Sequence, residues 1–228
     1  MKPNNIILEC VVGSHMYNLD TPESDIDTKG IYVLPLQELV STMDGFKKID
    51  KVYDHNDPDW AYYEVQKYMS LVMKGNPTAL ELLYANEYNI LEPLGQILVE
   101  NRSAFLSKKI KNAYLGYARQ QVVRKYRNAS DITEYRAGKH VRHTWRLIKQ
   151  YEQLATTGTL NPRLTDEERK ECFEFQEKSF NEVAEWFRTE SARVESLPSV
   201  LPDEPDYTKI NAVLETIRKY VWNILLVR

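Results

Sequence analysis

Two short apolar runs near the start of the chain are typical of β-strands. Residues 6–12 read Ile-Ile-Leu-Glu-Cys-Val-Val, and residues 30–34 read Gly-Ile-Tyr-Val-Leu. Both runs are short and rich in β-branched side chains, which favours strands over helices. Residues 60–65, Trp-Ala-Tyr-Tyr-Glu-Val, are consistent with either a third strand or the start of a helix.

Most of the remaining apolar positions recur at helical spacing. Gly75 is expected to end one helix, and Asn76-Pro77 to cap and open the next. Thr165 and Glu168 form the capping pattern of a later helix. The pattern predicts helices over residues 36–45, 68–74, 77–84, 91–100, 104–127, 133–157, 165–196 and 207–227.

Composition is that of an ordinary globular protein. Of the 228 residues, 43% are hydrophobic and 28% are charged. No apolar run approaches the ~20 residues that cross a bilayer, so we expect no membrane partner. The first residues do not form a secretory signal, and Cys10 and Cys172 are expected to be free thiols. These features predict a cytoplasmic protein.

The net charge of −3 conceals a strong asymmetry. Between Arg102 and Lys149 there are 13 Lys and Arg against two acids, a net +11, so the remainder carries −14. A segment of this kind favours contact with a polyanion such as RNA. A solvated helix face explains the same charges equally well.

Gly13-Ser14 directly follows the first predicted strand. Glycine permits a tight turn and a close approach of another group to the backbone. Ser14 can cap a following helix, whose free N–H groups favour phosphate. The sequence therefore predicts a phosphate-binding turn at this strand end.

Asp25 and Asp27 lead into the second predicted strand. Because strand side chains alternate, the two carboxylates should point the same way while Ile26 points to the opposite side. Adjacent carboxylates repel each other unless a cation lies between them, and Mg²⁺ prefers oxygen ligands and substrate phosphates. An Asp-x-Asp pair alone is a weak signal, but its place after Gly13-Ser14 strengthens it.

At these residues the chain resembles the polymerase-beta-like nucleotidyltransferase superfamily, whose pattern is Gly-Ser, a short helix and then Asp-x-Asp on the next strand. Further residues resemble the branch associated with RNA repair, namely Tyr17, Ser24, 29–33, 74–77 and 81–83. The resemblance implies an α+β fold with a small mixed β-sheet nucleotidyltransferase core flanked by helices, followed by a C-terminal helical bundle. We place the boundary near residue 100, giving a catalytic domain over 1–100 and a basic, substrate-binding helical domain over 101–228.

The superfamily adds a third carboxylate from a neighbouring strand. The resemblance places an Asp at the start of the segment that leads to Lys74-Gly75, which selects Asp59. Glu64 is the second candidate, and Asp57 lies behind both. A solvated turn residue is the alternative for any acid in this polar loop.

Lys139, His143 and Arg146 fall three or four residues apart and share one helix face. This face is similar to the helix that packs against the nucleotidyltransferase core in the RNA-repair-like family. Arg146 could hold a triphosphate by forked hydrogen bonds and Lys139 as a point charge. His143 on the same face is also expected to be a nucleotide-binding residue, and a core or capping role is the alternative.

The resemblance implies transfer of a nucleoside monophosphate from an NTP to an acceptor hydroxyl, with release of pyrophosphate. Gly13 and Ser14 would hold the phosphates, while Asp25, Asp27 and Asp59 would bind Mg²⁺ or Mn²⁺. The basic segment favours RNA as the acceptor. A protein acceptor, as in antitoxin-type relatives, and a nucleotide-binding module without catalysis are the alternatives.

Overall fold

A computed structural model describes residues 2–40, 49, 52–54, 60–127 and 134–226, and its fold is α+β. Five described strands form one mixed sheet: β1 (Ile6–Val12), β2 (Asp27–Tyr32), β3 (Val52–Asp54), β4 (Trp60–Glu64) and β5 (Ile90–Leu91). Their order is β3-β4-β2-β1-β5, with β2 and β4 parallel and the other neighbours antiparallel. The ambiguous segment at residues 60–65 is therefore a strand that passes into a helix.

Short helices with the expected caps follow the strands. Helix α1 (Leu36–Leu39) comes after β2, and residues 41–45 of the predicted helix lie outside the described residues. Helix α3 (Val65–Met73) is capped at Lys74 and followed by Gly75, which has a left-handed φ of +74°. Asn76 then caps α4 (Pro77–Leu80), as predicted, and accepts from the Ala79 amide. The 3₁₀ helix η1 (Glu81–Tyr84), α5 (Pro93–Glu100) and the 3₁₀ helix η2 (Arg102–Phe105) complete this half.

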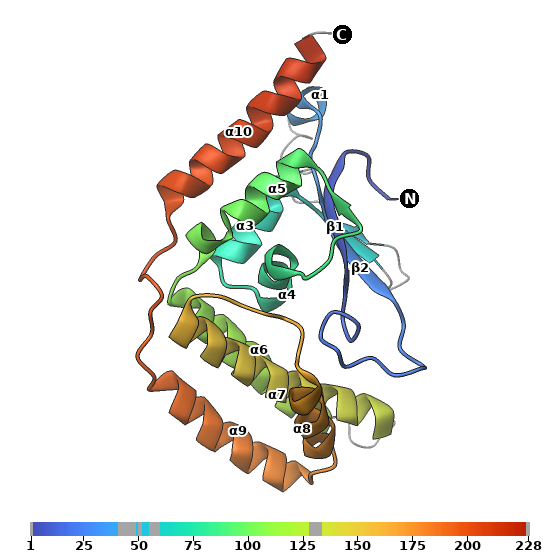
Figure 1. The fold of residues 1–228 in the computed structure, drawn as a ribbon, viewed down its shortest axis with the longest axis vertical. Helices are drawn as coiled ribbons and strands as arrows, with labels where there is room; N and C mark the ends of the chain where they lie inside the picture. The colour runs from blue at the N-terminus through green and yellow to red at the C-terminus, as the bar shows by residue number, and fades with distance from the viewer. Residues whose placement is uncertain (1, 41–48, 50–51, 55–59, 128–133, 227–228) are drawn as a thin grey trace.

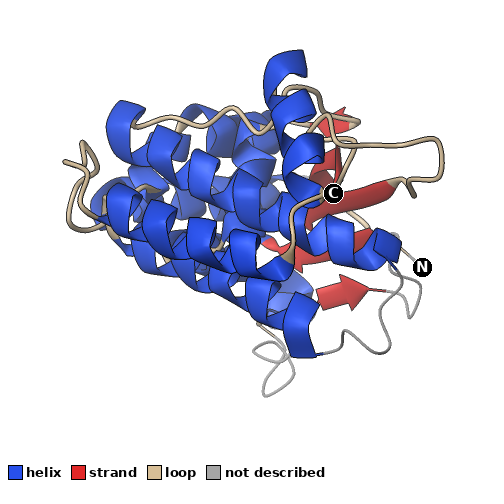
Figure 2. Ribbon diagram, turned by 90° about the horizontal axis from the view of Figure 1, so that it is seen from below, coloured by secondary structure: helices blue, strands red, loops and turns tan. Residues whose placement is uncertain are grey.

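Long helices form the second half: α6 (Lys109–Arg127), α7 (Glu134–Thr157), α8 (Asp166–Gln176), α9 (Phe180–Glu195) and α10 (Tyr207–Leu226). Figure 1 shows α6 to α9 as a bundle below the sheet, whereas α10 runs back along the N-terminal half. In the orthogonal view the strands lie to one side of the helices (Figure 2). None of the described helices is long and apolar enough to cross a bilayer.

The prediction of one continuous helix over residues 165–196 is wrong. The chain forms α8 and α9, separated by Glu177, Lys178 and Ser179. Ser179 accepts from the Glu182 amide, and the Glu182 side chain accepts from the Ser179 amide. This reciprocal capping box starts a new helix and so breaks the run of helical spacing. The helix predicted from residue 104 likewise begins only at Lys109, after η2.

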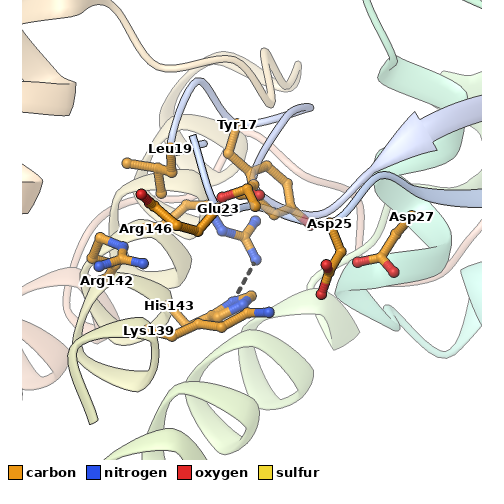
Figure 3. A pocket seen from close by; sticks show the side chains of 11 residues that line it. Tyr17, Leu19, Glu23, Asp25, Asp27, Lys139, Arg142, His143 and Arg146 are labelled. Atoms are coloured by element: carbon orange, nitrogen blue, oxygen red, sulfur yellow. Dashed lines mark hydrogen bonds between the residues drawn. The ribbon is translucent and has the colours of Figure 1, made fainter. Parts of the chain in front are cut away.

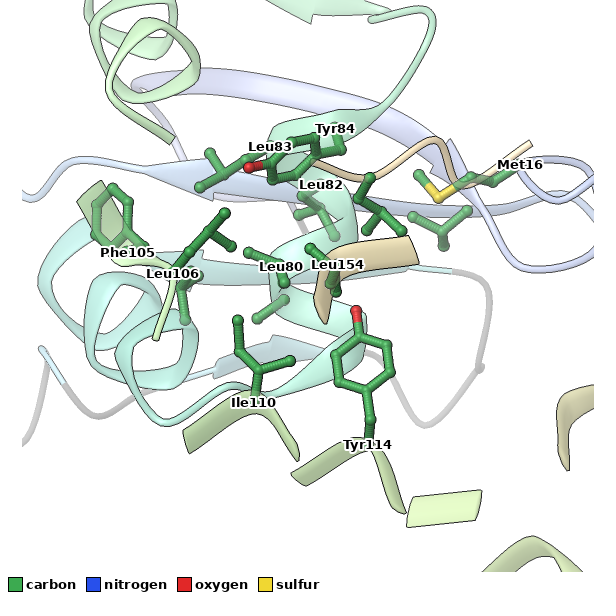
Figure 4. Packing of buried hydrophobic residues seen from close by; sticks show 14 of the residues in the cluster. Met16, Leu80, Leu82, Leu83, Tyr84, Phe105, Leu106, Ile110, Tyr114 and Leu154 are labelled. Carbon is green, nitrogen blue, oxygen red and sulfur yellow. The ribbon is translucent and has the colours of Figure 1, made fainter. Parts of the chain in front are cut away.

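A single large core connects the two halves. Its buried side chains include Leu8, Leu80, Tyr114, Ile148 and Ile217, from β1, α4, α6, α7 and α10, and Figure 4 shows the part around Leu80, Tyr114 and Leu154. Helix α10 is joined to the end of β4 by an ion pair between Arg218 and Glu64 with an N–O distance of 2.7 Å. The buried contacts of this core continue across residue 100. The division into 1–100 and 101–228 stays a prediction.

Two helical glycines give a matched test of this packing. A Cβ on Gly95 in α5 would overlap the Ile7 carbonyl of β1, whereas a Cβ on Gly116 in α6 would meet nothing within 4 Å. We predict that Gly95→Ala lowers the free energy of unfolding by about 1–3 kcal/mol through overpacking. Gly116→Ala should raise the free energy of unfolding by about 0.5–1 kcal/mol, because alanine reduces the backbone entropy of the unfolded chain. Urea unfolding measures both, and equal effects would contradict the described packing of α5 on β1.

Candidate active site

The segment after β1 is a tight turn. Gly13 has a φ of +70°, a left-handed conformation that favours glycine. The Tyr17 amide donates to the Gly13 carbonyl at 3.3 Å, and the Leu19 amide to the Ser14 carbonyl at 2.9 Å. The helix expected after Ser14 is thus only a hydrogen-bonded turn. Within the described chain, the amides of residues 14–16 donate to no backbone carbonyl, and Ser14 of this turn lines the pocket described below.

Strand register brings this turn against one of the predicted carboxylates. Val12, the last residue of β1, is paired with Asp27, the first residue of β2. A Cβ on Gly13 would lie 3.0 Å from Asp27 Oδ2. The absence of a side chain at Gly13 therefore lets the turn's backbone approach the Asp27 carboxylate closely.

Asp25 precedes β2 and lies beside Asp27 at the same pocket. Both aspartates line a pocket of about 90 Å³. Ile26 between them is 63% exposed and lines a separate pocket with Val11 and His15. The alternation of side-chain direction that the sequence predicts for Asp25, Ile26 and Asp27 is therefore present, although Asp25 and Ile26 precede the strand itself.

Helix α7 forms the opposite wall of the small pocket. Figure 3 shows Lys139, His143 and Arg146 on this helix, with Asp25 and Asp27 facing them from the strand side. Six of the eight predicted site residues line the pocket: Ser14, Asp25, Asp27, Lys139, His143 and Arg146. Gly13 adjoins it through Asp27, and Asp59 lies outside the described residues.

Glu64, the second candidate for the third carboxylate, is at the other end of the parallel strands. It is paired with Tyr32, five residues beyond Asp27, which places it about 16 Å along the sheet. Its side chain is buried, accepts from the Gln66 amide at 2.8 Å and is paired with Arg218. Glu64 therefore caps α3 and anchors α10, and does not adjoin Asp27.

A buried network lies behind the pocket. The Glu81 carboxylate accepts from the Tyr17 hydroxyl at 2.5 Å and from Arg146 Nη1, and both charged side chains are fully buried. The Arg146 guanidinium lies over the Tyr17 ring at 3.6 Å from its centroid. Burial lowers the pKa of Arg146, but the facing Glu81 carboxylate outweighs it, so the net pKa is raised. Arg146 is thus a permanent buried cation with an internal partner.

Two further cationic or titratable groups adjoin the carboxylates. Lys29 is two residues after Asp27 on β2, so the two side chains share one face of the sheet. Burial lowers the pKa of Lys29, and the negative charges of Glu81 and Asp27 act in the opposite direction. Burial, together with the charges of Arg146 and Lys139, lowers the pKa of His143 well below its usual range. At neutral pH His143 is therefore an uncharged imidazole.

Helix α8 and the segment before it hold the turn from outside. Arg169 donates to the carbonyls of Asn18 and Asp20, the latter at 2.8 Å. The Leu164 amide donates to the Tyr17 carbonyl at 3.2 Å. Residues about 150 positions apart in the sequence thus fix the loop that leads to Asp25.

The sequence alone predicts no individual role for Glu81, Lys29 or Arg169. Glu81 belongs to the residues 81–83 that carry the resemblance, and an acid beside Leu80, Leu82 and Leu83 is itself a signal of a buried charge pair. Arg169 carried no local signal, because its partners are backbone carbonyls of a distant loop.

The donor set suits a hard divalent cation. Asp25 and Asp27 offer carboxylate oxygens at one pocket, and the backbone of Gly13 closely approaches the Asp27 carboxylate. In the described part of the chain no cluster of three metal-ligating side chains occurs. Two carboxylates plus substrate phosphates nevertheless form a common Mg²⁺ environment.

A mixed sheet with a Gly-Ser turn beside paired aspartates defines a protein of the nucleotidyltransferase class. The chain belongs to the family RlaP, the RNA repair pathway DNA polymerase beta family, whose family model matches residues 1–214. The resemblance stated from the sequence and the expected α+β fold are thereby confirmed.

Two individual proteins are also similar to this chain. An uncharacterised 38.9 kDa protein in the nrdC-mobD intergenic region of Enterobacteria phage T4 is 28% identical over 133 residues, which cover 50% of this chain and 37% of that protein. The crystal structure of a nucleotidyltransferase-like protein from Exiguobacterium sibiricum 255-15 aligns over 99% of this chain and 75% of its own, with a TM-score of 0.31 and 10% identity.

The buried pair gives a stability prediction. Glu81→Leu alone should lower the free energy of unfolding by about 3–5 kcal/mol, because Arg146 would remain buried without its carboxylate. In the double variant Glu81→Leu/Arg146→Met, most of this loss should be recovered, since neither charge is then buried alone. Denaturant unfolding of the two single variants and the double variant measures the coupling. Additive losses would show that the two side chains do not interact.

Proposed function

We propose that this protein is a metal-dependent nucleotidyltransferase that moves a nucleoside monophosphate from an NTP to an acceptor hydroxyl. The observation that carries the proposal is one pocket with carboxylates on one wall and cations on the other, with Ser14 of the Gly13-Ser14 turn also in its lining. A triphosphate needs cationic and amide donors, and its metal ion needs carboxylates. This pocket supplies both within one small volume.

Each wall has a distinct part in the proposed reaction. Ser14 and the amides of the turn hold phosphate oxygens, and exposed Lys139 adds a point charge from α7. Asp25 and Asp27 would hold Mg²⁺ or Mn²⁺, which when bound stabilises the attacking and leaving oxygens of an in-line displacement. Asp59 remains our candidate for a third carboxylate.

The pocket's size indicates which part of the substrate lies inside. Its volume of about 90 Å³ is well below the roughly 300 Å³ of sites that enclose whole small molecules. We therefore place the phosphates in the pocket and the nucleoside outside it. The identity of the base is then read by residues beyond the pocket walls.

For the acceptor we favour RNA. The family's description supports it, and so does the basic segment from Arg102 to Lys149. Some of that charge is used internally, because among the described side chains four of these cations have carboxylate partners: Lys108, Lys109, Lys111 and Arg146. Contact with RNA would therefore depend on the remaining Lys and Arg residues of the segment, including Lys139 at the pocket and exposed Arg119.

A protein acceptor is the second candidate. The specific observation in its favour is this pairing with carboxylates of the same chain, which neutralises part of the +11 locally. A module that binds nucleotides without catalysis is less favoured, since it would have no use for Asp25 and Asp27 at one pocket.

The catalytic assignment predicts that Asp27→Asn abolishes transfer, because the variant loses a metal-binding charge while keeping the side chain's shape. Asp20→Asn is the matched control: Asp20 lies on the same loop, pairs with His15 and does not line the pocket. Transfer from a labelled NTP should fall at least about 100-fold in the first variant and little in the second. Full transfer by folded Asp27→Asn would overturn the proposed site.

The acceptor assignment predicts the fate of the label. In Mg²⁺ with labelled NTP, total RNA and a protein lysate, label should enter material that ribonuclease destroys and protease leaves intact. Transfer should weaken steeply as salt rises, because counterion release contributes to RNA binding. Label on a protein band instead would establish the protein acceptor, and binding of NTP without any labelled product would favour the module.

A further inference from the structure

Glu81 uses both of its carboxylate oxygens inside the protein. Oε2 accepts from the Tyr17 hydroxyl and Oε1 accepts from Arg146 Nη1. Glu81 comes from η1, Tyr17 from the phosphate-binding turn and Arg146 from α7, so one buried side chain joins the three elements around the pocket. It does not itself line the pocket.

The guanidinium of Arg146 is held from several sides. Besides Glu81, the Gln150 side chain accepts from Nη1 at 2.6 Å, and the Tyr17 ring lies beneath the guanidinium plane. Because Arg146 is completely buried and its fork is rigid, these contacts fix where Nη2 points. Nη2 lies 3.3 Å from His143 Nδ1 (Figure 3).

This contact determines the tautomer of His143. An arginine side chain has only donors, so His143 Nδ1 must be the acceptor. In a neutral imidazole the proton is then on Nε2. The lowered pKa of His143 agrees with a neutral ring, and its cause is burial together with Arg146 and Lys139.

The ring is placed to use that Nε2 proton at the pocket. His143 lines the pocket one helical turn after Lys139 and packs edge-on against Tyr17, with centroids 6.2 Å apart and planes at 78°. The charged groups at the same pocket are Lys139, Arg142 and Arg146 on α7 and Glu23, Asp25 and Asp27 across it. A neutral donor beside these cations can bind a phosphate oxygen without exchanging a proton.

We propose that His143 is a neutral Nε2–H donor to a phosphate oxygen of the bound nucleotide, and that Glu81 and Arg146 are positioning residues that fix its tautomer. The inference rests on the proposed function for the identity of the ligand. The sequence predicts Arg146 as a direct ligand of the triphosphate, whereas this inference makes it a positioning residue. The reason is that Glu81 and Gln150 already accept hydrogen bonds from Nη1.

The tautomer can be tested without any activity. In a two-bond ¹H–¹⁵N correlation of the full chain, free of nucleotide at neutral pH, His143 should have a protonated Nε2 and an unprotonated Nδ1. The four histidines are distinguished by the signal that disappears in His143→Gln. A protonated Nδ1, an imidazolium or an even mixture of tautomers would overturn the inference, whether or not the protein transfers nucleotides.

The positioning role is tested by Arg146→Lys, which keeps the positive charge opposite Glu81 but removes the fork that reaches His143. The expected spectrum is a mixture of the two neutral tautomers. A spectrum unchanged from the wild type would show that Arg146 does not set the tautomer. If this variant does not fold, the wild-type spectrum still decides the first part.

The phosphate contact is tested by a pair of variants at His143. The amide nitrogen of His143→Gln can replace Nε2, whereas the shorter side chain of His143→Asn cannot reach that place. The KM for NTP should stay close to wild type in the Gln variant and rise about 10- to 100-fold in the Asn variant, as expected for one hydrogen bond to a charged acceptor. Equal KM values in the two variants, whether raised or unchanged, would contradict the contact. Absence of NTP binding by the wild type would instead overturn the proposed function.

Discussion

The buried ion pair between Glu81 and Arg146 is the interaction on which the rest of the site depends. It joins two side chains that are 65 positions apart and completely buried, and Tyr17 completes it from the turn. A lone charge at such depth would be very unfavourable, so α7 has one stable position against η1. That position places the Lys139 and His143 face across the pocket from Asp25 and Asp27. The pair therefore holds the α7 wall of the pocket against η1 and, through Tyr17, against the turn after β1.

The geometry of the pocket on the strand side depends on the register between β1 and β2. Val12 pairs with Asp27 at the point where β1 ends and β2 begins, so the turn at Gly13 and the carboxylate of Asp27 must be neighbours. Contacts from Leu164 and Arg169 hold the loop between them against the helical half. The sheet and the bundle thus share one site and one continuous core. Such a site is complete only when both halves are in place.

Local signals predicted much of this arrangement. Gly13-Ser14, Asp25-x-Asp27 and the spacing of Lys139, His143 and Arg146 are readable within a few residues, and the structure brings these residues to one place. Local signals did not reveal the tertiary contacts. The partner of Arg146 is a glutamate on another element, and Arg169 donates to the backbone carbonyls of a distant loop. The error over residues 165–196 had a different cause, because the Ser179 and Glu182 capping box was readable but helical spacing continued through it.

The most direct test of the central claim is a crystal structure with Mn²⁺ and a non-hydrolysable NTP analogue. The account predicts an anomalous peak between Asp25 and Asp27, with the triphosphate bound by the turn at Gly13-Ser14 and facing Lys139 and His143. The nucleoside should extend out of the small pocket. A triphosphate bound elsewhere on the protein, or Mn²⁺ absent from these two aspartates, would contradict it.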